Sequence, residues 1–201
     1  ETVGCINIIC SDKTGTLTQN RMTVTQLYNG TNHIAVTSGD TFTEPFHQVI
    51  EYAILSSQVN PYDPMERAII SIGDKYLQNS EHIHKDWVME KEYPLSKELL
   101  AMSRVFSNTG TGRRVIAAKG APEAIFDLCH LPAAEVGKHE KAVAEMASRG
   151  LRVLGVARAE LSTENLPTIQ HDFNFEFMGL IGLSDPIREN VPEAVAECYR
   201  A

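Results

Sequence analysis

The stretch that most constrains this 201-residue chain is residues 10–18, CSDKTGTLT, a polar loop directly after an apolar run. The run at residues 3–9 is short and rich in β-branched residues, which predicts a buried parallel strand. Asp12 would then lie at the carboxyl end of a strand, where open α/β sheets bind ligands. Gly15 allows a tight turn whose hydroxyls and backbone N–H groups can face an anion. The pattern therefore predicts a carboxylate beside a phosphate-binding turn, which is the arrangement that an aspartyl-phosphate needs.

Thr14 stands two positions after Asp12 and distinguishes two kinds of chemistry. Phosphatases that use an aspartate nucleophile usually carry a second Asp at this position, where it acts as general acid and base. A threonine hydroxyl does not do this near neutral pH, so a phosphorylated Asp12 would wait for a separate hydrolysis step. This difference favours an energy transducer over a simple phosphatase.

Composition argues against several classes of partner. The chain has a net charge of −8 and no long run of Lys or Arg, whereas nucleic acids and anionic membranes are bound by basic stripes. The four cysteines form no CxxC pair, so no cysteine zinc site is indicated. No apolar run approaches the ~20 residues of a membrane-spanning helix, and the first residues are not expected to be a signal peptide. The chain starts without Met just before its first motif, and we expect it to be a piece of a longer protein.

Hydrophobic periodicity and turn residues predict a series of further strands and helices. The strands are expected at residues 24–28, 33–36, 87–93, 101–106, 115–119, 151–157 and 173–183. The helices are expected at residues 46–58, 64–76, 122–129, 133–149 and 191–199. The turn at residues 109–112 lacks the Gly-Lys-Ser/Thr of a phosphate loop, so we expect it to join two strands as a hairpin.

Three more polar stretches carry candidate binding residues. Lys119 ends a strand just before a helix N-terminus that favours anions, so it either contacts a nucleotide or is a solvated turn residue. Glu66 lies in the first turn of its helix, where its negative charge complements the helix dipole. Asp185 and Arg188, in the stretch SDPIR, can form a salt bridge within their loop.

The seven histidines form no convincing ligand set with a nearby Cys or Asp. His82 and His84 are spaced so that they could chelate an adventitious metal ion. We expect them instead in a solvated loop before a strand.

The strings DKTGTLT, KGAPE and DPIR stand in this order and resemble the motifs of P-type cation-transporting ATPases across the whole chain. The pattern is similar to the type II branch, which moves calcium and similar cations. The resemblance implies an α/β chain with a nucleotide-binding domain at residues 24–183, an antiparallel sheet flanked by helices. Residues 1–23 and 184–201 would be pieces of a Rossmann-like, HAD-like phosphorylation domain. The hinge would lie near Thr23 and Ser184.

The resemblance also implies roles for individual residues. Asp12 would be phosphorylated, Lys13 would add positive charge, and Thr14 would help to hold the phosphoryl group. Asp12 and Thr14 would both bind magnesium. The nucleotide would be bound by Glu66, Tyr93, Leu95, Lys119, Gly120, Arg152, Asp185 and Arg188.

This chain departs from the family on the adenine side. Leu95 stands at the position of the adenine-stacking Phe, and Leu100 stands at the position of a nearby Lys. The base would pack either on an aliphatic side chain or on Tyr93. Losing the ring stacking would weaken base binding by roughly 1–3 kcal/mol.

For the intact parent the resemblance implies ATP hydrolysis coupled to cation transport, with ATP and Mg²⁺ as cofactors. The parent would be a multi-pass protein of the cell membrane, with this segment facing the cytoplasm and the cation held by transmembrane helices outside this chain. The piece alone is expected to bind nucleotide with little or no turnover. Two alternatives stay open, a soluble phosphatase of the related dehalogenase-like fold and a nucleotide-binding module without catalysis.

Overall fold

The computed structural model of the chain describes residues 8–37, 41–78, 80–82, 84, 86–161 and 165–200. Within these residues seven strands form one sheet in the order β2-β1-β7-β6-β5-β4-β3, and every neighbouring pair is antiparallel. The strands are β1 (Thr23–Tyr28), β2 (His33–Ala35), β3 (Trp87–Tyr93), β4 (Ala101–Asn108), β5 (Arg114–Gly120), β6 (Arg152–Leu161) and β7 (Glu176–Ser184). The predicted antiparallel sheet is confirmed.

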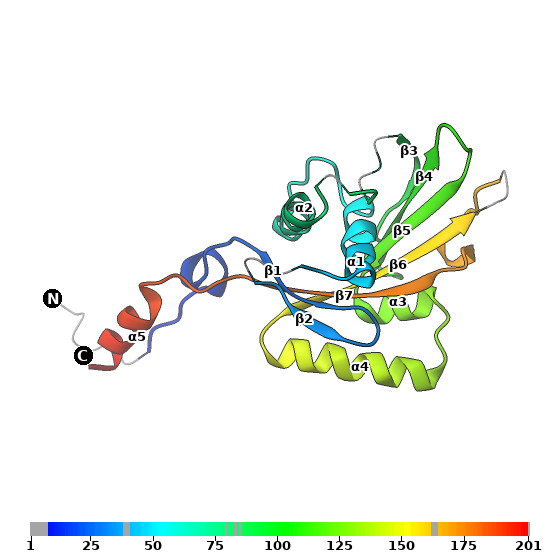
Figure 1. Cartoon of the computed structure of the whole chain (residues 1–201). Coiled ribbons are helices and arrows are strands. Elements are labelled where there is room, and N and C mark those ends of the chain that lie inside the picture. Colours follow the sequence, from blue (N-terminus) through cyan, green and yellow to red (C-terminus); the bar gives the residue numbers. More distant parts are fainter. Residues whose placement is uncertain are drawn as a thin grey trace.

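Helices cover both faces of this sheet, with α1 and α2 on one face and α3 and α4 on the other (Figure 1). The helices are α1 (Glu44–Leu55), α2 (Pro64–Tyr76), α3 (Pro122–Leu128), α4 (Ala133–Ser148) and α5 (Val191–Arg200). Val115 and Ala117 of β5 belong to the core beneath α1 and α2, whereas Ile116 and Ala118 pack against α3. Because both of its faces are buried, β5 is apolar along most of its length instead of alternating.

Asp63 fixes the start of α2. Its Oδ1 accepts the backbone N–H of Met65 at 2.7 Å and of Glu66 at 3.2 Å. Pro64 occupies the first helical position, where no N–H is needed. The helix covers the predicted residues 64–76, and its cap places Glu66 in the first turn.

Two strand boundaries differ from the predictions by three residues or more. β6 continues to Leu161 instead of ending at residue 157, because residues 158–161 pair with residues 114–117 of β5. Ala159 is buried and Glu160 is exposed, so the alternation of a strand continues through this polar segment. β7 begins at Glu176 instead of residue 173, and Phe173 follows a short 3₁₀ turn at Gln170–Asp172.

The first predicted strand, residues 3–9, lies largely outside the described residues. Its last two members, Ile8 and Ile9, are 80% and 68% exposed and form no strand, so the prediction is wrong for these two. Every strand pair in the described part of the chain is antiparallel and belongs to the one sheet. A parallel strand needs a neighbour for its hydrogen bonds, and none lies beside Ile8 and Ile9 among the described residues.

The chain leaves the sheet through two adjacent segments. Thr23 of β1 pairs with Ser184 of β7, and beyond this pair Thr18 bridges Ile187. Figure 1 shows the N-terminal segment and α5 projecting together from this edge, and α5 buries none of its residues. No helix in the described residues has both the length and the apolar content to cross a bilayer.

The loop that follows α2 is packed on α1 and is not the solvated loop that the sequence predicts. Glu51 of α1 is 6% exposed, and its carboxylate contacts His82 Nδ1 at 2.6 Å and His84 Nε2 at 2.5 Å. The ring of His84 is also stacked on Trp87, with 3.8 Å between the centroids. The expectation for these histidines is wrong, because Glu51 lies more than thirty residues away in the chain and its burial is a long-range property.

Candidate functional site

Asp12 and the turn that follows it are exposed at the end of the molecule remote from β3. Asp12 has extended backbone angles, φ −67° and ψ 140°, and its side chain makes no capping hydrogen bond. Gly15 has φ +80°, a left-handed conformation that glycine adopts without strain, as the sequence predicts for a tight turn. Asp12, Lys13 and Thr14 are all exposed, so the carboxylate, the ammonium and the hydroxyl are accessible to a ligand.

Thr18 is the residue that holds this turn together. It is 2% exposed, and its Oγ1 donates to Asp185 Oδ2 at 2.6 Å and accepts the N–H of Gly15 at 3.1 Å. The guanidinium of Arg188 donates to the carbonyl of Gly15 at 2.8 Å and to that of Thr18 at 3.0 Å. Asp185 and Arg188 therefore contact the turn itself, and the stretch DPIR acts as a clamp on residues 15–18.

Arg152 and the turn line a common cavity. A space of about 250 Å³ is bounded by Lys13, Thr14, Arg152 and Asp185, together with Asp63 and Met65 at the start of α2. Arg152 is exposed, and its guanidinium contacts the Met65 sulfur at 3.7 Å. Lys13 and Arg152 bring two positive charges to this cavity, beside the carboxylates of Asp63 and Asp185.

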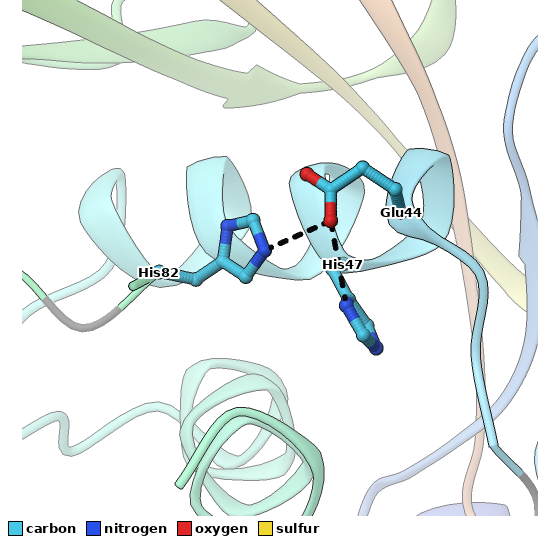
Figure 2. A group of neighbouring side chains, drawn as sticks. All are labelled: Glu44, His47 and His82. Carbon is cyan, nitrogen blue, oxygen red and sulfur yellow. Dashed lines mark hydrogen bonds and ion pairs between the residues drawn. The ribbon is translucent and has the colours of Figure 1, made fainter. Parts of the chain in front are cut away.

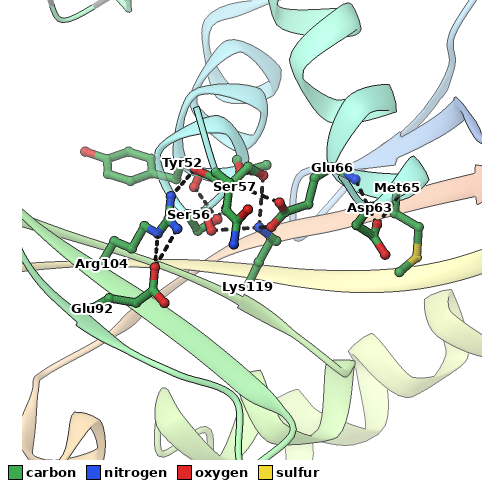
Figure 3. Close-up of polar contacts among 11 residues, drawn as sticks. Tyr52, Ser56, Ser57, Asp63, Met65, Glu66, Glu92, Arg104 and Lys119 are labelled. Atoms are coloured by element: carbon green, nitrogen blue, oxygen red, sulfur yellow. Dashed lines mark hydrogen bonds and ion pairs between the residues drawn. The ribbon is translucent and has the colours of Figure 1, made fainter. Parts of the chain in front are cut away.

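Lys119 is buried, which excludes the solvated-turn alternative. It is 6% exposed, and its ammonium donates to Glu66 Oε1 at 2.5 Å, Ser56 O at 2.6 Å and Ser57 Oγ at 2.9 Å (Figure 3). An ammonium has three hydrogens, so these contacts use all of its donors. Burial lowers the pKa of Lys119, and the hydrogen bond that its ammonium donates to Glu66 opposes this shift.

The carboxyl end of α1 explains why two cations meet here. The last carbonyls of a helix have no partner inside the helix and favour positive charge. Lys119 contacts the carbonyl of Ser56, and Arg104 contacts the carbonyl of Ser57 while its Nε donates to Glu92 at 2.8 Å (Figure 3). Ser56, Ser57 and Arg104 were not predicted from the sequence, because a polar pair after an apolar helix does not show which distant strand will supply the cations.

A second cavity, of about 380 Å³, opens beside this network. Its walls include Gln58, Met65, Glu66, Leu95, Met102, Lys119, Gly120 and Leu154. Four of the predicted nucleotide-binding residues therefore lie together, namely Glu66, Leu95, Lys119 and Gly120. Asp63 and Met65 line this cavity and also the smaller one beside Arg152, so the two cavities are neighbours.

Gly120 is required by the close approach of two strands and not by a turn. A Cβ atom built on it would lie 2.3 Å from the carbonyl oxygen of Leu100 and 2.5 Å from the Cα of Ala101. Any side chain would push β4 away from β5 at the edge of the cavity. Gly120 was predicted as a nucleotide-binding residue, and it does line the cavity. The close approach of β4 and β5 is the reason that a glycine is needed there.

Tyr93 is placed elsewhere. Its ring is 6% exposed and packs edge-on against Phe173, and its hydroxyl donates to the carbonyl of Pro167 at 2.6 Å. Tyr93 does not line the cavity, whereas Leu95 does and is 59% exposed. The cavity is therefore lined by the aliphatic side chain of Leu95 and not by the ring of Tyr93.

Comparison with known proteins identifies the family. Residues 59–190 match the sequence family described as P-type ATPase, cytoplasmic domain N. The whole chain is 29% identical to a calcium-transporting ATPase of Bacillus subtilis and 30% identical to one of Listeria monocytogenes. It covers 27% and 25% of their lengths. A human calcium-transporting ATPase type 2C member 1 is 28% identical over 97% of this chain and 24% of its own length.

The chain spans about a quarter of the length of these curated relatives. The matched family covers the sheet from before α2 to the end of the DPIR stretch, which includes Glu66, Lys119 and Arg152. The chain belongs to the P-type ATPase family, and residues 59–190 are its cytoplasmic domain N.

Proposed function

We propose that this chain is the nucleotide-binding part of an ATP-driven cation pump, and that the adenine of ATP occupies the 380 Å³ cavity. The carrying observation is the composition of its walls, where the apolar side chains of Leu95, Met102 and Leu154 face the carboxylate of Glu66 and the ammonium of Lys119. A purine has an apolar face and an amino group that donates hydrogen bonds. Apolar walls with a few oriented polar groups are typical of such sites.

Lys119 acts in this proposal as a positioning residue. All three of its hydrogens are used within the protein, and one of them holds Glu66 Oε1. The other oxygen of Glu66 accepts the backbone N–H of Gln58 at 3.2 Å. Both carboxylate oxygens are thus fixed at the cavity wall, which orients Glu66 before a base arrives.

The phosphates would run from this cavity into its neighbour. The shared residues Asp63 and Met65 join the two spaces, and Lys13 and Arg152 supply positive charge on the second. This path leads from Glu66 toward the turn that carries Asp12. The clamp formed by Asp185 and Arg188 supports the turn and would act on the nucleotide only through it.

In the intact parent we propose that Asp12 attacks the γ-phosphorus of ATP. The new bond joins the Asp12 carboxylate to phosphorus, the bond from phosphorus to the bridging oxygen breaks, and ADP leaves with that electron pair. Lys13 offsets charge on the transferring group. Thr14 provides no acid or base for immediate hydrolysis, so the acyl phosphate persists, which disfavours the soluble phosphatase alternative.

The donors at the turn fit magnesium. The carboxylate of Asp12 and the hydroxyl of Thr14 are exposed oxygen ligands, the type that Mg²⁺ prefers. Bound there, Mg²⁺ would neutralise phosphate charge.

Residues 24–183 would form the nucleotide-binding domain, with residues 1–23 and 184–201 as pieces of the phosphorylation domain. The pair Thr23 and Ser184, where both segments leave the sheet, supports a hinge at this place. The names of the relatives support calcium as the transported ion of a membrane-embedded parent whose domain N faces the cytoplasm.

Titration of ATP into the ¹⁵N-labelled chain tests the proposal. Amide shifts should move first around Glu66, Leu95 and Gly120, with weak affinity because Leu95 offers no ring. Leu95→Phe should tighten binding by roughly ten-fold, since base–aromatic stacking contributes about 1–3 kcal/mol. Val88→Phe, at an exposed position of β3, is the matched control and should leave the affinity unchanged. Amide shifts confined to other surfaces at ~10 mM ATP would contradict the site. A Kd at that concentration corresponds to a binding free energy of only about −3 kcal/mol.

A further inference from the structure

Two histidines and a carboxylate meet at the first turn of α1 (Figure 2). Glu44 and His47 come from that turn, and His82 comes from the loop after α2. Glu44 Oε2 lies 3.3 Å from His82 Nε2 and 3.8 Å from His47 Nδ1. All three ligand atoms lie within 4.8 Å of one another, and no function assigned above uses them.

A second carboxylate fixes the orientation of the His82 ring through Nδ1, the nitrogen that does not face Glu44. The buried carboxylate of Glu51 lies 2.6 Å from its Nδ1, so the proton of the neutral ring is held on Nδ1. In that tautomer Nε2 and the carboxylate of Glu44 are both acceptors, and either a proton or a metal cation completes their contact.

A metal-binding histidine commonly donates its other N–H to a carboxylate, which fixes the ring and raises its basicity. Glu51 provides this second partner for His82. Glu51 is itself held, because His84 Nε2 contacts its other oxygen at 2.5 Å. The arrangement is therefore a ligand set with a supporting shell and not a chance group of surface side chains.

We propose that Glu44, His47 and His82 bind a transition-metal dication of the zinc class. Zinc ligands at 2.0–2.2 Å in a tetrahedron are separated by about 3.3 Å, which matches the separation of Glu44 and His82. His47 Nδ1, at 3.8 Å from Glu44 Oε2, would move closer when an ion binds. The side chains of Glu44 and His47 are 56% and 25% exposed, so the ion has an entry path and room for a water ligand.

The donor types select the metal. Two imidazole nitrogens and one carboxylate suit zinc, cobalt, nickel or copper, whereas magnesium and calcium prefer sites made of oxygen. The site would therefore not compete with the oxygen ligands at Asp12 and Thr14. A bound ion would tie the loop after α2 to α1, the helix whose other end accepts Lys119 and Arg104.

Titration of the full chain with Zn²⁺ by calorimetry at pH 8, and with Co²⁺ by visible absorption, tests the site. We expect one ion per chain with a Kd in the micromolar range or tighter, and a tetrahedral cobalt spectrum. The single tryptophan, Trp87, stacks on His84, so Co²⁺ should also quench its fluorescence. His47→Gln alters a partly exposed side chain, keeps the fold, and should weaken binding at least ten-fold.

The control is His171→Gln. His171 is a surface histidine 3.2 Å from Asp127 and in ring contact with His130, so it tests whether any histidine–carboxylate pair is sufficient. This variant should bind as the wild-type chain does. Absence of binding at ~100 μM Zn²⁺, or equal affinity of the wild-type chain and His47→Gln, would overturn the proposal.

Discussion

Lys119 determines how the larger cavity is built, because one ammonium links the end of α1 to the start of α2. Lys119 lies in β5, and its partners Ser56 and Glu66 each lie more than fifty residues earlier in the chain. A buried ion pair is costly to break, since the remaining partner keeps its desolvation cost without its counter-charge. The residue is therefore expected to matter for stability as well as for binding.

Lys119→Met should lower the free energy of unfolding by about 3–5 kcal/mol, because Glu66 is left buried and unpaired. Adding Glu66→Met should recover much of this loss, since a buried pair is often replaced by apolar groups at little cost. Urea denaturation monitored by circular dichroism measures both. Lys141→Met, on the exposed face of α4, is the control and should change stability by less than about 0.5 kcal/mol. An equally small effect of Lys119→Met would contradict the buried network.

Cys129 should be chemically inert in the folded chain. Burial raises the pKa of the Cys129 thiol from 9.0 to about 12, and the negative charge of Glu176 adds to the shift. At pH 8 iodoacetamide should modify Cys10 and Cys198, which are exposed, and leave Cys129 unmodified until urea is added. Mass spectrometry of the digested chain reads this directly, and rapid native labelling of Cys129 would contradict it.

The same shift predicts a pH dependence of stability. The folded thiol has the higher pKa, so ionisation favours the unfolded chain between pH 9 and about 12. The stabilising contribution is complete below pH 9 and is lost as the pH rises toward the folded value. Relative to Cys129→Ala, the wild-type chain should lose up to about 1.4 kcal/mol per pH unit above 9, as measured by urea denaturation. Parallel stability curves for the two proteins would contradict the shift.

At the scale of elements, the turn at residues 15–18 depends on the segment that follows β7. Thr18→Val keeps the shape of the side chain but removes the hydrogen bonds to Asp185 and to the N–H of Gly15. The amide of Gly15 should then lose hydrogen-exchange protection, while the amides of β5 keep theirs, because the turn lies outside the sheet. Thr16→Val, an exposed position in the same turn, is the control. Equal protection of Gly15 in both variants would contradict the clamp.

The elements that the sequence predicts well are those with a strong local signal. Asp63 and Pro64 mark the start of α2, and β5 extends by one residue at each end beyond the predicted residues 115–119. β6 was predicted too short, because Arg158 and Glu160 look like a loop until their pairing with β5 is known. A pattern of apolar residues predicts which segments are buried. Where a strand ends in polar residues, its length depends on pairing with the adjacent strand.

The site was only partly predictable for the same reason. Glu66, Leu95, Lys119 and Gly120 were expected together and do line one cavity. The partners of Lys119 and the contacts of Glu51 with His82 were not foreseen, because each joins residues at least thirty positions apart. Tyr93 is the last residue of β3 and Leu95 lies beyond the strand, and only the fold shows that the ring of Tyr93 packs against Phe173.

At the scale of the whole molecule, two neighbouring cavities extend from Glu66 to Lys13 and Thr14, which follow Asp12 in the exposed turn. The cavities share Asp63 and Met65, and Lys13 and Arg152 line the cavity beside the turn. In the described part of the chain, the backbone connects the sheet to the turn next to the paired residues Thr23 and Ser184. Movement about this pair would change the distance between base site and carboxylate.

The most direct test of this account is covalent labelling of the full-length parent with ATP radioactive at the γ-phosphate. Asp12 should form an acid-stable, hydroxylamine-labile acyl phosphate. Asp12→Asn should abolish the label and keep nucleotide binding, equal or tighter, because one negative charge near the γ-phosphate is gone. Thr14→Asp should shorten the lifetime of the label by restoring a general acid and base. Labelling of a different residue, or cation transport that survives Asp12→Asn, would contradict the account.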